Sequence, residues 1–141
     1  MMATSEVKAL IEGEWSVDQV FDDVTTQLLG TAAQAPARAE IRAKQAGVFS
    51  GSAVVEAYQS LLGKLKIVPE VKEGQDFKVG DILVRLQGAQ GDLLVFERTF
   101  LNLLCHLSGV ATLTREYVNA MGETSTKLLA TRKTLPGLRS L

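Results

Sequence analysis

The chain has 141 residues, of which 46% are apolar and 22% are charged, and this composition is typical of a folded globular protein rather than a disordered one. Its formal net charge of −1 argues against a dedicated nucleic-acid surface, which would need a basic excess. A single cysteine excludes an intramolecular disulfide, and we find neither a signal peptide nor an apolar run of the ~20 residues that a membrane helix needs, so we expect a cytoplasmic protein without membrane contact.

The N-terminal third is predicted to contain helix followed by strand. Apolar residues at helical spacing predict helix within residues 5–29, with a break at 22–26, where good helix formers are scarce. Apolar residues then alternate with charged ones over 38–46. This period of two predicts a strand with one apolar and one charged face.

A further helix and two more strands are predicted before residue 90. Ser52 is a suitable N-cap for a helix over 52–62. Strand patterns follow over 66–71 and 82–86. The first 90 residues therefore mix short strands with helices around one small sheet.

Apolar helices dominate the next part of the chain. Asp92 is a suitable N-cap for a helix whose apolar stripe runs to Leu107. The pair Ser108-Gly109 is expected to end it, and a second helix is predicted over 110–121. Residues 127–130 are then predicted to form a short strand.

Polar and basic residues follow that strand directly, namely Thr131, Arg132 and Lys133. An α/β barrel begins in this way, with a helix, then a strand, and then reactive groups at the C-terminal end of the strand. A closed barrel typically needs ~250 residues, so we expect only its first helix and strand, in residues 110–141. Residues 1–109 would form a separate N-terminal domain.

The basic group at 131–133 suits a small anion. An arginine fork binds a carboxylate through two parallel hydrogen bonds, and a lysine adds a compact charge. Charge runs are usually solvated surface, so a plain basic loop is the alternative. Arg98 allows two interpretations as well, because it lies within the apolar stripe: an intrahelical salt bridge or snorkelling side chain, or a binding residue.

Cys105 and His106 do not form a nucleophile–base pair. They are neighbours on a helix, so their side chains point roughly 100° apart. We expect a buried core cysteine beside an ordinary helix histidine. The chain has one histidine, which excludes a histidine pair as metal ligands, and we assign no catalytic residue and no metal ligand.

The glycine-punctuated strands over 71–83 are similar to the biotinyl and lipoyl carrier fold. Such carriers present a modifiable lysine on an exposed hairpin between characteristic neighbours. Lys44 and Lys64 lack those neighbours. A non-catalytic carrier-like module therefore stays an alternative, without its modification site.

Several segments together resemble the quinolinate phosphoribosyltransferase family, in the same order along the chain. The matching motifs are Asp23-Val24-Thr25-Thr26, 39–44 with 47–51, Gly80-Asp81 with Leu83 and Gly88, Glu97-Arg98-Thr99 with Leu101-Asn102, 108–112 with Thr114, and 131–139. The likeness covers residues 10–141, and the last two motifs are specific.

This resemblance implies an α+β N-terminal sandwich domain followed by the truncated start of an α/β barrel. It also implies a homodimer in which the sheet face of one subunit covers the barrel mouth of the other. The reaction would join quinolinate to phosphoribosyl pyrophosphate with Mg²⁺, and would yield nicotinate mononucleotide, pyrophosphate and CO₂ in NAD biosynthesis. A related phosphoribosyltransferase, of the type encoded with molybdate transport systems, is the alternative enzyme.

The same resemblance implies the substrate-binding residues. Thr131, Arg132 and Lys133 would hold the quinolinate carboxylates, and Arg98 would reach that site from the partner subunit. Ala130 stands where the family often has aspartate. The family's later motifs, which carry the metal-binding and phosphate-binding groups, do not occur in these 141 residues, so we expect the chain alone to be inactive and to hold no Mg²⁺ ligand.

Overall fold

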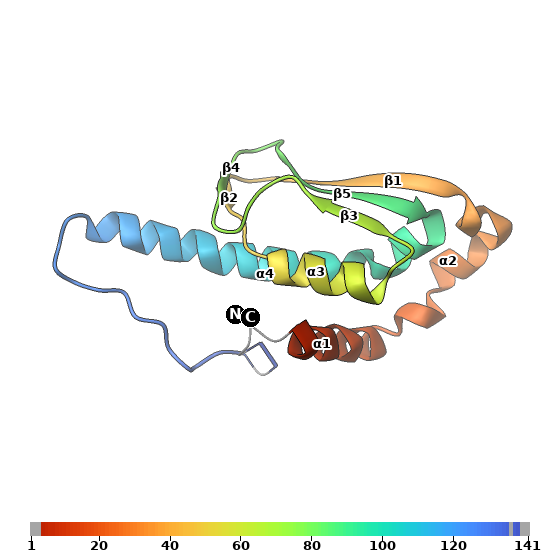
Figure 1. Cartoon of the computed structure of the whole chain (residues 1–141), viewed down its shortest axis with the longest axis horizontal. Helices are drawn as coiled ribbons and strands as arrows, with labels where there is room; N and C mark the ends of the chain where they lie inside the picture. The colour runs from red at the N-terminus through yellow and green to blue at the C-terminus, as the bar shows by residue number, and fades with distance from the viewer. Residues whose placement is uncertain (1–3, 136, 139–141) are drawn as a thin grey trace.

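A computed structural model describes residues 4–135 and 137–138 of the chain (Figure 1). The elements are, in order, α1 (Thr4–Val17), the 3-10 helix η1 (Val20–Asp22), α2 (Val24–Leu28), the 3-10 helix η2 (Gly30–Gln34), β1 (Pro36–Arg42), β2 (Gly47–Val48), α3 (Ser52–Leu61), β3 (Lys66–Pro69), β4 (Asp76–Phe77), β5 (Ile82–Ala89) and α4 (Gln90–Met121). The mixture of helices and short strands predicted before residue 90 is confirmed.

The main sheet has three antiparallel strands in the order β1-β5-β3. A bulge between Ile41 and Arg42 shifts the register where β1 pairs with the start of β5. A separate two-stranded ladder joins β2 to β4. The predicted strands over 66–71 and 82–86 correspond to β3 and β5, whereas the strand predicted over 38–46 ends at Arg42, next to the bulge.

Helices α3 and α4 cover one face of the main sheet, and α1 packs against both helices on the far side (Figure 1). The core lies between these layers. Its largest fully buried side chains are Val7, Ile11, Phe49, Val54, Tyr58 and Val84. Among the described residues no helix covers the other face of the sheet, which carries the charged side chains of β1 and β5, as the alternation predicted.

A buried aromatic cluster joins α1, α3 and α4. Trp15 Nε1 donates to the Tyr58 hydroxyl at 3.4 Å, and that hydroxyl lies 2.7 Å from Thr99 Oγ1. The ring centroid of Tyr58 lies 4.7 Å from that of Phe100, and Trp15 lies equally close to Phe96. Burial raises the pKa of the Tyr58 phenol, which keeps it neutral and able to donate. Polar atoms are thus paired inside an otherwise apolar contact of three helices.

The start of α3 is capped from a distant loop, and the prediction that Ser52 caps it is wrong. The N-cap is Gly51, which has no side chain to offer. The Glu73 carboxylate accepts from the backbone N–H of Gly51 at 3.0 Å and of Ser52 at 2.9 Å. It also accepts from the Ser50 hydroxyl at 2.6 Å. A full negative charge at a helix N-terminus is favoured by the helix dipole, so Glu73 supplies the acceptor that a local serine usually provides.

The pKa of Glu73 reflects this capping role. Burial alone would raise the pKa of its carboxyl, but the hydrogen bonds from Ser50, Ser52 and Gly51 outweigh burial and hold that pKa below the ordinary value of 4.5. Since the folded-state pKa is the lower one, the stabilisation is complete above the ordinary pKa. It is lost as the pH falls through the folded-state value.

Replacing Glu73 by glutamine is expected to lower the free energy of unfolding near neutral pH by about 1–2 kcal/mol, the size of a lost helix cap. Urea unfolding at neutral and at acid pH measures the difference, which should shrink in acid, where the wild-type carboxyl is also neutral. Glu116→Gln is the control, because Glu116 is an exposed glutamate on α4, away from the cap of α3. A Glu73→Gln deficit that is the same at both pH values contradicts the charge-based account.

Helix α4 is continuous from Gln90 to Met121, so the predicted break at Ser108-Gly109 is wrong. Ser108 Oγ exchanges hydrogen bonds with the backbone N–H and C=O of Ser50, both at 3.2 Å. One turn later, Thr112 Oγ1 accepts from the Val48 N–H at 2.9 Å. These contacts tie the middle of the helix to β2 and the loop after it, and tertiary support of this kind outweighs the weak helix propensity of serine and glycine.

The segment after α4 also differs from expectation. Residues 127–130 form no strand, and no helix or strand occurs in the described part of the chain beyond Met121. A strand needs a neighbour to pair its backbone groups, and none of the described strands lies beside this segment. The start of a barrel is therefore not formed here. The division into 1–109 and 110–141 stays a prediction, and its boundary falls inside α4.

Two further expectations about α4 require correction. Cys105 is exposed, not buried in the core. Helix α4 is also long and apolar enough to cross a membrane by length and composition, with a mean hydropathy of 1.3 over 18 residues. Core helices of soluble proteins meet the same criteria, and α4 packs Phe96, Phe100 and Leu103 into the core.

Candidate functional site

Arg98 extends from the first half of α4 into solvent. Its side chain is 70% exposed, and Nη1 donates to Asp18 Oδ1 at 3.0 Å. Asp18 directly follows α1, 80 residues earlier in the chain, so the partner is on another element and not on the same helix as expected. The adjacent Thr99 points inward to Tyr58. One motif therefore supplies an exposed cation and a buried structural hydroxyl.

A second carboxylate lies near Arg98. The Asp23 side chain accepts from the Thr26 N–H at 2.7 Å and caps α2. The contact with Thr26 holds the pKa of the Asp23 carboxyl below its ordinary range, and the positive charge of Arg98 acts in the same direction. The break predicted at 22–26 occurs at Asp23, whose extended backbone separates η1 from α2, and the chain also turns earlier, at residues 18–19 after α1.

The predicted binding residues Thr131, Arg132 and Lys133 lie in the coil after α4, and all three are exposed. The Lys133 N–H donates to Thr131 Oγ1 at 3.2 Å, which closes a small local turn. Within the described ranges 4–135 and 137–138, Arg132 and Lys133 form no ion pair with an acidic side chain. Arg139, at the end of the same motif, lies outside the described residues.

The structure does not bring Arg98 and the 131–133 group together. No hydrogen bond or ion pair joins them among the described residues, and Figure 1 shows the segment after α4 running back beneath the molecule toward α1. A single copy of the chain therefore presents two separate cationic groups.

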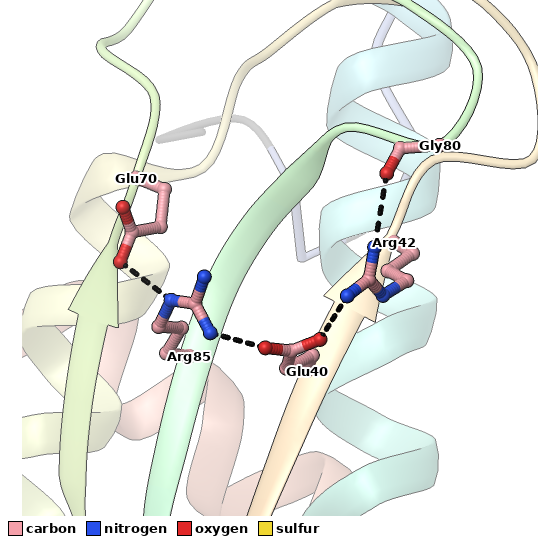
Figure 2. A network of polar contacts seen from close by, with 5 residues as sticks. All are labelled: Glu40, Arg42, Glu70, Gly80 and Arg85. Atoms are coloured by element: carbon pink, nitrogen blue, oxygen red, sulfur yellow. Dashed lines mark hydrogen bonds and ion pairs between the residues drawn. The ribbon is translucent and has the colours of Figure 1, made fainter.

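The charged network of Arg42, Arg85, Glu40 and Glu70 on the open face of the sheet is not a competing anion site. Arg85 on β5 donates to Glu40 and, from Nε, to Glu70 Oε1 at 3.0 Å, as Figure 2 shows. Glu40 also accepts from Arg42, whose Nη1 donates to the Gly80 carbonyl at 3.3 Å. The Arg42 hydrogen bond lowers the pKa of the Glu40 carboxyl. Two arginines and two glutamates balance, so this network leaves no cation in excess.

The comparisons with known proteins decide the family. The model of the quinolinate phosphoribosyl transferase N-terminal domain matches residues 23–108, and that of the C-terminal domain matches 110–141. The chain belongs to the quinolinate phosphoribosyltransferase family. This membership leaves the carrier-module alternative without a supporting observation.

Relatives in the quinolinate phosphoribosyltransferase family are about twice as long as this chain. A probable nicotinate-nucleotide pyrophosphorylase (carboxylating) of Bacillus subtilis is 36% identical over 137 residues, which cover 96% of this chain and 47% of the relative. The nicotinate-nucleotide pyrophosphorylase (carboxylating) of Mycobacterium leprae is 46% identical over 76 residues, which cover 54% of this chain and 27% of that relative. The solved nicotinate-nucleotide pyrophosphorylase of Francisella tularensis superposes with a TM-score of 0.88 at 28% identity, and the match covers 97% of this chain and 49% of that one.

The family motifs have structural tasks that the sequence did not reveal. Ser108 and Thr112 bind the backbone of the β2 region, and Asp23 caps α2. Asp18, the partner of Arg98, was missed altogether, because no local pattern indicates a contact across 80 residues. In the described part of the chain no three His, Cys, Asp or Glu side chains gather as a metal site.

Proposed function

We propose that these 141 residues are the N-terminal portion of a quinolinate phosphoribosyltransferase, which converts quinolinate and phosphoribosyl pyrophosphate to nicotinate mononucleotide, pyrophosphate and CO₂ in NAD biosynthesis. The family match over 23–108 and 110–141 carries the proposal. The two exposed cationic groups of the chain agree with it, because a pyridine dicarboxylate is a dianion and arginine forks bind carboxylates bidentately.

The proposed assembly is a homodimer in the cytoplasm. The separation of Arg98 from the 131–133 group within one chain supports a site that is built from two copies. In such a dimer Arg98 of one subunit would complete the pocket whose carboxylate clamp is Thr131, Arg132 and Lys133 of the other. The strand at 127–130, and the barrel that it would begin, would form only when neighbouring strands pair with it.

The chemistry that these side chains can supply is electrostatic. Cations beside the pyridine ring stabilise the negative charge that decarboxylation leaves on it, and they act most strongly in a site from which water is excluded. Mg²⁺ is part of the proposed reaction, in which it would assist the departure of pyrophosphate.

The first test is calorimetric titration of quinolinate into the 141-residue chain and into the full-length protein, at low and high salt. Binding is expected in the full-length protein, weakening with salt, and Arg132→Ala should abolish it. Arg42→Ala is the matched control, because Arg42 belongs to the balanced network on the sheet. Quinolinate-dependent release of CO₂ by the full-length protein separates this proposal from the molybdate-associated type of enzyme, and its absence with an intact fold would overturn the proposal.

A further inference from the structure

The guanidinium of Arg98 is engaged on one side only. Its single hydrogen bond among the described residues runs from Nη1 to Asp18, and none is formed there by Nε or Nη2. A guanidinium presents five N–H donors in a fixed, planar fork. The edge formed by Nε and Nη2 can therefore receive a carboxylate through two parallel hydrogen bonds while Nη1 stays on Asp18.

Asp18 is held more firmly than the arginine that it contacts. Its backbone N–H donates to the Glu14 carbonyl at 2.9 Å, which makes it the last hydrogen-bonded residue of the α1 turn. Trp15, one turn earlier, is 6% exposed and packs in the aromatic cluster. The Asp18 side chain is 29% exposed, against 70% for Arg98. An acceptor anchored at the end of a packed helix thus lies beside a long and exposed donor.

The next residue, Gln19, adds a second sign that this turn is constrained. It has φ 50° and ψ 43°, the left-handed conformation, and it is the one described residue other than glycine with a positive φ. Residues other than glycine adopt this conformation at a cost, so the surrounding structure must hold it. The turn brings the chain from α1 directly into η1 and leaves the Asp18 carboxylate facing α4.

We propose that Asp18 is the positioning residue for Arg98: it fixes the guanidinium in one orientation, so that the opposite edge receives a carboxylate of the substrate. This inference rests on the proposed function and deepens it by adding a residue to the same site. The benefit is entropic, since an exposed arginine loses rotamer freedom on binding and a preordered one has less to lose.

A competing role for Asp18, as an anion that blocks the site, agrees less well with the geometry. A carboxylate that blocked the site would accept hydrogen bonds from both nitrogens on one edge of the Arg98 guanidinium. Asp18 accepts only one, from Nη1. Asp23, the other nearby carboxylate, is committed to the Thr26 N–H. The Asp18 side chain is partly exposed, so water and salt screen its repulsion of a bound dianion.

The first measurement needs no substrate. Nitrogen-15 relaxation of the Arg98 Nε–H group in the 141-residue chain should show a rigid group in the wild type and a mobile one in Asp18→Ala. Asp18→Asn keeps an acceptor oxygen without the charge, and it should restore most of the order. Asp22→Ala is the matched control, because Asp22 is an exposed aspartate of the same region and has no described contact with Arg98. Unchanged Arg98 mobility in Asp18→Ala would overturn the inference.

The second measurement is steady-state kinetics of the full-length protein with saturating phosphoribosyl pyrophosphate. Asp18→Ala should raise KM for quinolinate by about three- to tenfold, the cost of ordering one long side chain, with kcat unchanged within about twofold. Asp18→Asn should return KM close to the wild-type value. An equal effect of Asp22→Ala, or no rescue by asparagine, contradicts the positioning role. A wild-type protein that does not turn over quinolinate refutes the proposed function instead, and the relaxation data still decide whether Asp18 orders Arg98.

Discussion

Replacing Arg98 by lysine is expected to lower kcat/KM for quinolinate by about a hundredfold in the full-length protein. Lysine keeps the positive charge and loses the planar fork that binds a carboxylate through two bonds. Loss of a bidentate charged pair costs about 3 kcal/mol, and this free energy corresponds to roughly a hundredfold change in kcat/KM. Stability should hardly change, because an exposed ion pair such as that with Asp18 contributes about 0.2–1 kcal/mol.

The matched control is Arg85→Lys. Arg85 is also partly exposed and also paired with carboxylates, but it lies on the open face of the sheet. Steady-state kinetics and urea unfolding of both variants separate binding from folding. We expect a loss of kcat/KM in Arg98→Lys alone, with both proteins folded. A comparable loss in both variants, or in neither, contradicts the assignment of Arg98 to the substrate site.

Short-range patterns predicted the local elements of the fold well. The alternation over 38–46 indicated β1, and the apolar spacing after Ser52 indicated α3, because each element buries one face on the core. The cap of α3 was beyond such reasoning. Glu73 reaches it from a loop 21 residues away, and a local serine that could have capped the helix is present in the sequence.

Long-range contacts explain the other errors. Ser108-Gly109 looks like a helix end, yet the serine is held by Ser50, 58 residues away, and the helix continues. The strand predicted at 127–130 fails for the opposite reason, since a strand exists only with a neighbour, and none of the described strands is available to it. The pairing of Arg98 with Asp18 likewise depends on how α1 packs against α4. Family motifs identified the cation but not its partner.

The largest effect on stability is expected at Tyr58, which is 1% exposed at the centre of the aromatic cluster. Tyr58→Ala should lower the free energy of unfolding by about 3–5 kcal/mol, the usual cost of deleting a buried aromatic ring. Because small domains are marginally stable, that loss would leave much of the chain unfolded near body temperature. Tyr117→Ala is the control, since Tyr117 is 57% exposed on α4 and should matter by no more than about 0.5 kcal/mol.

Two further variants separate the ring from its hydroxyl. Tyr58→Phe keeps the packing with Phe100 and should cost about 1–2 kcal/mol, because Thr99 Oγ1 and Trp15 Nε1 each lose a partner inside the core. Adding Thr99→Val to Tyr58→Phe removes one of these unpaired groups, so the double variant should be less destabilised than the two single losses predict. Strict additivity in urea unfolding would show that the hydroxyls of Tyr58 and Thr99 are not coupled, and that the buried hydrogen bond does not hold α3 to α4.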